Sequence, residues 1–98
     1  MKLAEALPEF VNDLEGALMS LGRGDVLAQL KDAVLERWAY DEFSDTTYLQ
    51  LSAVPVDRMH VEMLSLYDEL GVNVDMDDHG RLVGIEVLDG KRVASLLG

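Results

Sequence analysis

Hydrophobic residues in the first part of the chain recur at steps of three and four positions. One stripe of this kind has six members: Leu7, Phe10, Val11, Leu14, Leu18 and Leu21. Such spacing is typical of an amphipathic helix that packs its apolar side against a core. Because proline is tolerated in a first helical turn, we predict that this helix begins near Pro8. It is predicted to end at Gly22-Arg23-Gly24, where glycine permits a left-handed backbone.

A second helical stripe follows directly after these glycines. Its apolar members are Leu27, Leu30, Val34 and Trp38. Asp25 stands where an N-cap residue is expected. Two amphipathic helices joined by so short a break predict an antiparallel helical hairpin over residues 1–39. Neither helix can bury its stripe alone, so the hairpin needs a second layer to cover.

From residue 40 onward the pattern changes from helical spacing to alternation. The polar residues 40–45 favour a turn, and residues 46–52 then alternate, with Thr47, Leu49 and Leu51 on one face. Alternation over this length is typical of a half-buried β-strand. We therefore predict a turn followed by a strand at the start of the second part.

Two further segments near the end of the chain predict a β-hairpin, since the first alternates strictly and the second is rich in β-branched residues. They span residues 72–77 and 81–88, and Asp77-Asp78-His79-Gly80 between them suits a tight turn. If Asp77 pairs with Arg81, one face of the hairpin is apolar, with Val72, Val74, Met76, Leu82 and Leu88. The opposite face then carries the polar residues Asn73, Asp75, Asp77 and Arg81. Asp89 is placed to cap a short final helix through Val93, Leu96 and Leu97.

Residues 57–71 admit two interpretations. Asp57 as N-cap and Gly71 as stop would enclose a helix whose stripe is Met59, Met63, Leu66, Tyr67 and Leu70. Met59, Val61 and Met63 also alternate, which permits a strand. For so short a segment the hydrophobic period alone does not separate the two.

Two segments resemble domain-of-unknown-function family 2283. The first is Tyr40-Asp41, a spacer, Asp45, two residues and then the strand that contains Tyr48. The second is the closing hairpin, residues 72–77 followed by 80–88, so the resemblance covers residues 40–89. It implies a small antiparallel β-meander in which residues 58–63 form a strand, and it brings no activity, cofactor or catalytic residue. We favour such a strand followed by a helical turn over residues 65–70, with the full helix as the alternative.

Composition narrows the functional classes. The chain has 98 residues, of which 49% are hydrophobic, enough for one domain with a real core. Its 19 Asp and Glu against 8 Lys and Arg give a net charge of −11, which argues against nucleic acid or an anionic membrane as partner. The absence of cysteine excludes disulfides, thiol nucleophiles and cysteine-based zinc sites. No export signal or apolar run of membrane-spanning length is recognisable, so we expect a cytoplasmic protein.

The segment from Asp75 to Glu86 partly matches a calcium-binding loop. Asp75, Asp77, Gly80 and Glu86 occupy the first, third, sixth and twelfth positions of such a loop. His79 at the fifth position, however, offers nitrogen where a hard cation needs oxygen. The flanking segments also predict strands, whereas this loop type lies between helices. Calcium binding is therefore kept only as an alternative to a plain hairpin turn.

Acid–base chemistry is the other candidate. Glu86 is predicted to share the apolar face of Val72, Val74 and Met76, where burial would raise its pKa. No second acid accompanies it at a defined spacing, and His60 and His79 lack a third metal ligand. We therefore expect no catalytic, cofactor-binding or metal-binding residues, and no enzyme.

Taken together, these patterns predict a single α+β domain over residues 1–98. The helical hairpin, residues 1–39, packs on an antiparallel sheet with a terminal helix, residues 40–98. The expected function is non-enzymatic protein–protein interaction or regulation of the inhibitor or antitoxin kind, with a basic protein as partner and with self-association into a homo-oligomer. An acidic surface would supply association rate and selectivity, and buried anchors the affinity. The alternative is a small enzyme or ligand-binding domain that uses buried carboxylates, such as Asp75 or Glu86, in a pocket between helices and sheet.

Overall fold

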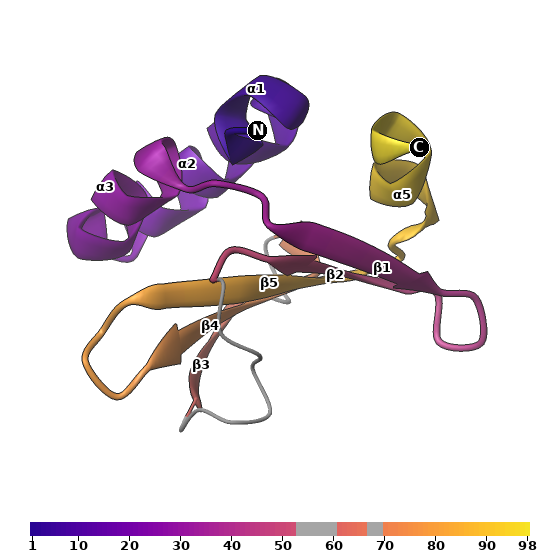
Figure 1. Ribbon diagram of the computed structural model, residues 1–98. Helices are drawn as coiled ribbons and strands as arrows, with labels where there is room; N and C mark the ends of the chain where they lie inside the picture. Colours follow the sequence, from indigo (N-terminus) through magenta and orange to yellow (C-terminus); the bar gives the residue numbers. More distant parts are fainter. Residues whose placement is uncertain (53–60, 67–69) are drawn as a thin grey trace.

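Helices cover one face of a five-stranded antiparallel sheet in the computed structural model, which describes residues 1–52, 61–66 and 70–98 (Figure 1). The described helices are α1 (Leu3–Ala6), α2 (Pro8–Ser20), α3 (Gly24–Asp32) and α5 (Lys91–Leu97). The strands are β1 (Arg37–Asp41), β2 (Thr46–Gln50), β3 (Val61–Leu66), β4 (Val72–Asp77) and β5 (Leu82–Leu88). This confirms the predicted α+β class, with helices both before and after the sheet.

The strand order in the sheet is β1-β2-β5-β4-β3, and neighbouring strands are antiparallel throughout. Strands β3, β4 and β5 follow one another as the predicted meander requires. The hairpin of β1 and β2 extends the sheet on the other side, with β2 paired to β5 rather than to β3. The edge strands are therefore β1 and β3.

Helix α2 confirms the start at Pro8 and most of the first predicted stripe, but Leu21 lies past the helix end and is 46% exposed. Its buried side chains are Val11, Leu14 and Leu18. Past its end, Gly22 adopts a φ of 70°, and the N–H of Arg23 donates to the carbonyl of Leu18 at 2.9 Å. A left-handed residue with this hydrogen bond closes many helices, and glycine adopts that conformation without steric cost.

The second helix is shorter than its stripe predicts. Helix α3 ends before Ala33, where the backbone becomes extended with a ψ of 138° and the carbonyl accepts the N–H of Leu3 at 2.9 Å. The prediction that Val34 and Trp38 continue the helix is wrong. Trp38 lies instead in β1, opposite Leu49 of β2, so β1 also takes the first two residues of the predicted turn at 40–45. Aromatic and β-branched residues suit a pleated strand, and pairing with β2 decides the outcome.

The predicted N-caps Asp25 and Asp89 are also wrong. The N-cap residue of α3 is Arg23, whose guanidinium lies 3.1 Å from the carboxylate of Asp25 in the first helical turn. At α5 the N-cap residue is Gly90, and the backbone N–H of Lys91 donates to Oδ1 of Asp45 at 3.2 Å. A carboxylate from the β1–β2 turn thus serves the helix in place of Asp89, because the fold brings two distant turns together.

The hairpin of β4 and β5 has its turn at residues 77–80 as predicted, but its register shifts. Asp75 pairs with Gly84 whereas Met76 pairs with Leu82, so Val83 is an extra residue on β5. Such a β-bulge moves every later residue of the strand to the other face. Glu86 consequently lies opposite Asn73.

Two predictions about this hairpin are therefore wrong. Glu86 does not share the apolar face of Val72, Val74 and Met76, and Leu88 falls out of phase with Val72, whose partner is Val87. Without the extra residue, regular pairing from the turn would have placed both on the helix-covered face. The bulge exchanges them for Ile85 and Val87, which are buried there.

The ambiguous residues 57–71 contain strand β3, which confirms the strand interpretation for its described part. Ser65 and Leu66, where the predicted helical turn begins, belong to β3 and pair with Asn73 and Val72. Leu70, at the end of the predicted helical turn, is helical, and Gly71 follows it with a φ of 66°. Residues 53–60 and 67–69 lie outside the described residues.

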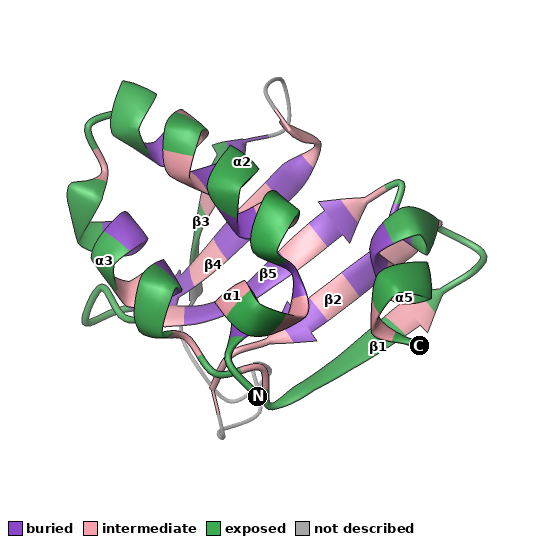
Figure 2. Cartoon of the chain, turned by 90° about the horizontal axis from the view of Figure 1, so that it is seen from above, coloured by how far each residue is buried: buried purple, intermediate pink, exposed green. Residues whose placement is uncertain are grey.

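The core fills the space between the helices and the sheet (Figure 2). Its buried members come from every described helix and from the four strands β2 to β5: Leu3, Leu7, Val11, Leu14, Leu18, Val26, Leu27, Leu30, Leu49, Leu66, Val72, Val74, Met76, Ile85, Val87 and Val93. Burial of this apolar surface is the main stabilising contribution to the fold. This burial requires that the helices cover one face of the sheet.

Candidate functional site

The face of the sheet opposite the helices, called the underside here, carries a cluster of polar side chains. By strand register it includes Tyr48, Asn73, Asp75 and Glu86. The hydroxyl of Tyr48 donates to Oδ2 of Asp75 at 3.0 Å, and the amide of Asn73 donates to Oε1 of Glu86 at 3.1 Å. Both carboxylates singled out in the sequence thus lie on one surface. Glu86 is bonded to the neighbouring strand β4, and Asp75 is bonded to β2, which lies two strands away.

Glycine at position 84 makes the Tyr48–Asp75 contact possible. Tyr48 on β2 has to cross β5 to reach Asp75 on β4, and its phenol lies over Gly84. A Cβ at this position would overlap the hydroxyl and ring of Tyr48. Close approach of a side chain over bare backbone is a common reason for glycine inside a strand.

The pKa values on the underside are shifted because Asp75 is half-buried and lies near a second carboxylate, Glu86. Burial raises the pKa of Asp75, and the negative charge of Glu86 adds to this, while the hydrogen bond from Tyr48 acts in the opposite direction. The pKa of Tyr48 is raised as well, first by burial and then by the charge of Asp75. A carboxyl whose ionisation is disfavoured can exchange protons nearer neutral pH, which is the property that the acid–base alternative needs.

The raised pKa of Asp75 gives a stability prediction with a definite sign. Ionised Asp75 works against folding above its folded-state pKa, and the cost disappears below the unfolded-state value of about 3.9. Asp75→Asn keeps an oxygen for the Tyr48 hydroxyl, so it is expected to be more stable than wild type at pH 7 and equal to it near pH 3. Urea denaturation at both pH values measures this. The exposed control Glu5→Gln should change neither, and a less stable Asp75→Asn at pH 7 would contradict the prediction.

Asp77, the third acid of the partial calcium motif, is occupied by its own turn. Its Oδ1 accepts the backbone N–H groups of His79 and Arg81 at 2.9 Å each, and its Oδ2 accepts Nε of Arg81 at 2.9 Å. These hydrogen bonds, that of the Arg81 backbone first, lower the pKa of Asp77. The side chain of His79 is exposed and lies 3.6 Å from Asp78. The motif therefore stabilises a hairpin turn, while Asp75 and Glu86 belong to the underside.

A second polar cluster lies where the β1–β2 turn meets α5. Oδ1 of Asp45 accepts the hydroxyl of Tyr40 at 2.7 Å as well as the N–H of Lys91. The Tyr40 hydrogen bond lowers the pKa of Asp45 and raises that of Tyr40 to about 12. Asp45 has a φ of 52°, as the turn requires. The hydrogen bond from Tyr40 positions Asp45, and the hydrogen bond from Lys91 ties α5 to the turn, so we assign this cluster a structural role.

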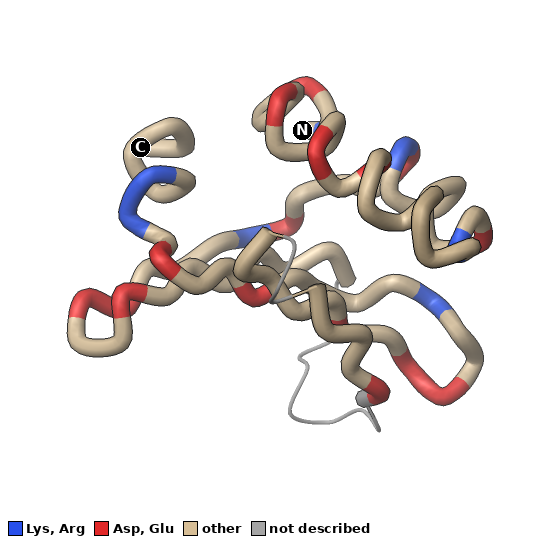
Figure 3. Tube along the Cα trace, turned by 180° about the vertical axis from the view of Figure 1, so that it is seen from behind, with Lys and Arg blue, Asp and Glu red and all other residues tan. Residues whose placement is uncertain are grey.

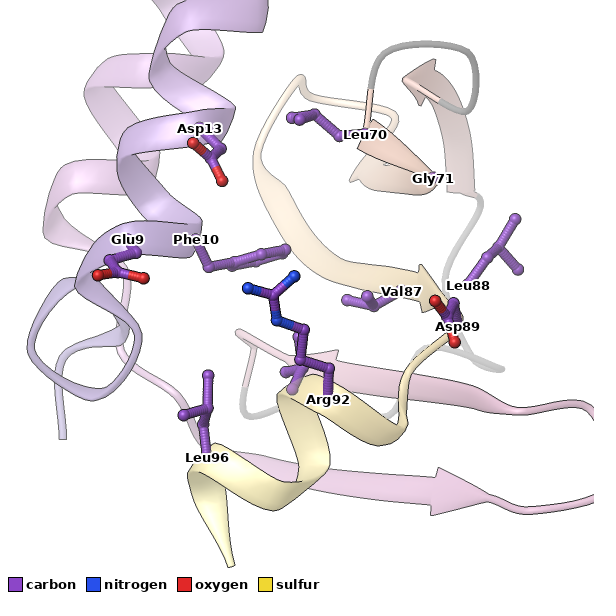
Figure 4. Close-up of a pocket in the computed structure, with 11 residues that line it drawn as sticks. Glu9, Phe10, Asp13, Leu70, Gly71, Val87, Leu88, Asp89, Arg92 and Leu96 are labelled. Carbon is purple, nitrogen blue, oxygen red and sulfur yellow. The ribbon is translucent and has the colours of Figure 1, made fainter.

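A cleft of about 580 Å³ opens between α2, α5 and the end of β5 (Figure 4). Its apolar lining residues are Phe10, Leu70, Val87, Leu88, Val93 and Leu96. Its charged lining residues are Glu9, Asp13, Asp89 and Arg92, and all four are exposed. Figure 4 shows Arg92 reaching from α5 toward Phe10 of α2. The cleft thus combines an apolar floor with a rim that carries three negative charges and one positive charge.

Among the described residues, the charges of Glu9, Asp13 and Arg92 on the rim are open to an incoming ligand, whereas Asp89 shares a side-chain hydrogen bond with Asp45. Within the described ranges, the ion pairs of the protein leave out Glu9, Asp13, Asp89 and Arg92. Glu9 and Asp13 are one helical turn apart, so both project from the same side of α2. A cationic group near them would meet two carboxylates without displacing an ion-pair partner from the described residues.

The model of one protein family matches residues 37–91, more than half of the chain. The family is described as a protein of unknown function, DUF2283. The chain belongs to this family. The match confirms the resemblance seen in the strand and hairpin segments, and it extends over β1 and the first residue of α5. No curated protein and no solved structure matches the chain.

The two candidate sites differ in how much of each lies within the DUF2283 match. The whole sheet, with the underside cluster, lies inside the matched residues. The cleft is shared, because Val87 and Asp89 lie within the match whereas Glu9 and Asp13 on α2 and Arg92 on α5 lie outside it. The cleft is thus formed where residues added to the DUF2283 segment meet that segment.

The part of the chain that the structure describes also bears on metal binding and on membrane insertion. No group of three or more His, Asp or Glu side chains there is arranged to hold a metal ion. No helix among the described residues is both long and apolar enough to cross a membrane.

Sequence reasoning did not single out the cleft residues Glu9, Asp13 and Arg92, or the role of Tyr48. A signal was available for the first two, because acids four residues apart flank Phe10 on a predicted helix. No local signal points to Arg92 or Tyr48. Their roles depend on which strand or helix lies opposite them.

Proposed function

We propose that this DUF2283 protein is a non-enzymatic interaction module that binds a basic, partly apolar segment of a partner protein in the cleft between α2 and α5. The role is regulatory, of the inhibitor or antitoxin kind, and cytoplasmic. The cleft carries the proposal, since it offers an apolar floor inside a rim with a net negative charge. Its volume of about 580 Å³ lies within the roughly 300–1,000 Å³ of typical ligand pockets.

Floor and rim have separate physical tasks in this proposal. Apolar side chains of the partner that enter the cleft supply affinity through burial, at about 25 cal/mol for each Å² removed from water. Carboxylates on the rim, together with the overall charge of −11, speed the approach of a basic partner and disfavour acidic ones. Acidic residues are spread around the molecule (Figure 3), so attraction acts from several directions while the cleft provides the anchor. The same charge argues against nucleic acid or an anionic membrane as the partner.

The test uses a short amphipathic peptide of lysine and leucine as probe, followed by amide chemical shifts in ¹⁵N-labelled protein. We expect saturable shifts around Phe10, Val87 and Val93. The double variant Glu9→Gln, Asp13→Asn is expected to weaken binding by about fivefold, since exposed charge contacts contribute roughly 0.2–1 kcal/mol each.

The matched control for this titration is Glu5→Gln with Glu36→Gln. This control also removes two negative charges, but from exposed positions outside the cleft. It should therefore bind the probe nearly as well as wild type. A glutamate–leucine peptide of equal length should bind far more weakly. Equal binding of both peptides, or shifts that map away from the cleft, would contradict the proposal.

A small ligand-binding domain is the second candidate, favoured by the size of the same cleft. It predicts that a small organic cation with an apolar ring, such as tryptamine, saturates the cleft at lower concentration than the peptide does. The enzyme alternative would depend on Asp75 and Tyr48 instead. Those residues line the underside and not the cleft. Mutations on the underside would therefore affect an enzyme activity and leave ligand binding in the cleft unchanged.

A further inference from the structure

Strand β1 is an edge of the sheet. Its five residues pair with β2 on one side, and on the other side no strand of the described residues joins it. Figure 2 shows it running along the rim of the molecule, exposed over most of its length. An edge strand presents a row of unpaired N–H and C=O groups, which can pair with another strand.

The sequence of β1 is complementary to itself in the antiparallel direction. The strand reads Arg37-Trp38-Ala39-Tyr40-Asp41. When two copies pair around a twofold axis at Ala39, Arg37 of each lies opposite Asp41 of the other, and Trp38 lies opposite Tyr40. Directly opposite side chains in such pairs are about 5 Å apart, close enough for ionic and aromatic contacts.

The aromatic pairs and the ion pairs would lie on opposite faces of the sheet. Trp38 and Tyr40 pair with Leu49 and Thr47, so they lie on the helix-covered face. Arg37 and Asp41 fall on the underside with the small Ala39 between them, which leaves room for two strands to approach. Each ion pair would therefore form among other polar side chains, and each aromatic pair next to the core.

The charged members of β1 are available for these contacts. Arg37 takes part in no ion pair within the described residues. Oδ1 of Asp41 accepts the N–H of Phe43 at 3.0 Å, which fixes the side chain and leaves Oδ2 for a partner. Trp38 is 37% exposed, and neighbouring Val34 is 42% exposed. The strand carries no net charge, so it is a neutral stretch on a strongly acidic protein.

We infer that β1 is an interface between two copies of this chain, which pair antiparallel around Ala39 and join two sheets into one of ten strands. The interface is distinct from the cleft, so it does not depend on the function proposed above. Repulsion between two acidic chains opposes pairing, but salt screens it beyond about 8 Å at physiological ionic strength. Association should therefore strengthen as salt is raised from low to physiological concentration. A twofold axis is also the commonest symmetry of soluble dimers.

Charge exchange at the two ends of β1 tests both the dimer and its register by sedimentation equilibrium at tens of micromolar. Wild type is expected to be dimeric. Arg37→Asp alone places two like-charged pairs in the interface, and so does Asp41→Arg alone. Each single variant is expected to associate about tenfold more weakly than wild type. An equimolar mixture of the two is expected to form heterodimers, because Asp at 37 then faces Arg at 41 and Arg37 faces Asp41.

The design separates register from total charge and from folding. Asp41→Arg makes the chain less acidic, so the weaker overall repulsion between two chains would strengthen association. The proposed register predicts the opposite, because it places Arg37 of one copy next to the new arginine of the other. The matched control Glu5→Arg makes the same charge change on α1 and should not weaken association. Recovery in the mixture shows that both variants fold. A monomeric wild type at low and physiological salt overturns the inference, and so does a dimer that neither variant weakens.

Discussion

A chain that begins at Glu36, and so lacks α1, α2 and α3, is expected not to fold cooperatively. The sheet of such a fragment would expose Leu49, Val74 and Ile85, which are at most 1% exposed in the full protein. A contiguous apolar face of this kind in water drives aggregation. The fragment is expected to be insoluble, or to bind hydrophobic dye and lack a sharp thermal transition by circular dichroism.

A point substitution within the same layer provides a graded version of this test. Leu14 is completely buried in α2, so Leu14→Ala is expected to lose about 3 kcal/mol of unfolding free energy through lost burial and the cavity left behind. Met19 on the same helix is 64% exposed, and Met19→Ala should change stability little. A soluble fragment of residues 36–98 with a cooperative melt would show that the sheet does not need the helices.

Gly90→Ala is expected to be strongly destabilising, by about 3 kcal/mol, because an added methyl group has no space. A Cβ at Gly90 would overlap the backbone nitrogen of Thr47, and Thr46 lies directly behind it. The carbonyl of Gly90 accepts the hydroxyl of Thr47 at 2.7 Å, and its N–H donates to the carbonyl of Asp45 at 2.7 Å. Because two of the three obstructing atoms belong to the backbone of Thr46 and Thr47, a side-chain movement cannot relieve the clash.

Gly16→Ala is the matched control for Gly90→Ala. Gly16 lies inside α2 with no atom within 4 Å of an added Cβ, so alanine there should stabilise the protein by about 0.5–1 kcal/mol. Thermal unfolding measures both, since 1 kcal/mol shifts the melting temperature of a domain of this size by roughly 4–8 °C. Equal melting temperatures for Gly90→Ala and wild type would show that α5 does not pack tightly on β2.

Elements whose signal lies within a few consecutive residues were predictable. Pro8 and Gly22 mark the two ends of α2 through their own backbone preferences. The alternation in β2 and β4 and the turn at residues 77–80 likewise follow from local chemistry. The family resemblance pointed to a strand within residues 58–63, and β3 begins in that range.

The candidate sites were predicted only in part. Asp75 and Glu86 were singled out and do lie together on one surface. Their setting was predicted wrongly, because a single extra residue at Val83 transferred Glu86 to the opposite face. A bulge depends on how two strands pair, and the sequence of one strand does not record it.

The sequence by itself determined the α+β class, the extent of α2, the alternating faces of β2 and β4, the closing turn and the strongly acidic charge. Each of these depends on the residue types within one short segment. Tertiary structure decided that Trp38 lies in a strand, that Asp45 caps α5, that Glu86 faces the underside, and that α2 and α5 enclose a cleft. The reason is that each outcome depends on a partner far away in the chain. Local preferences of about 1 kcal/mol or less are readily overridden by burial and pairing.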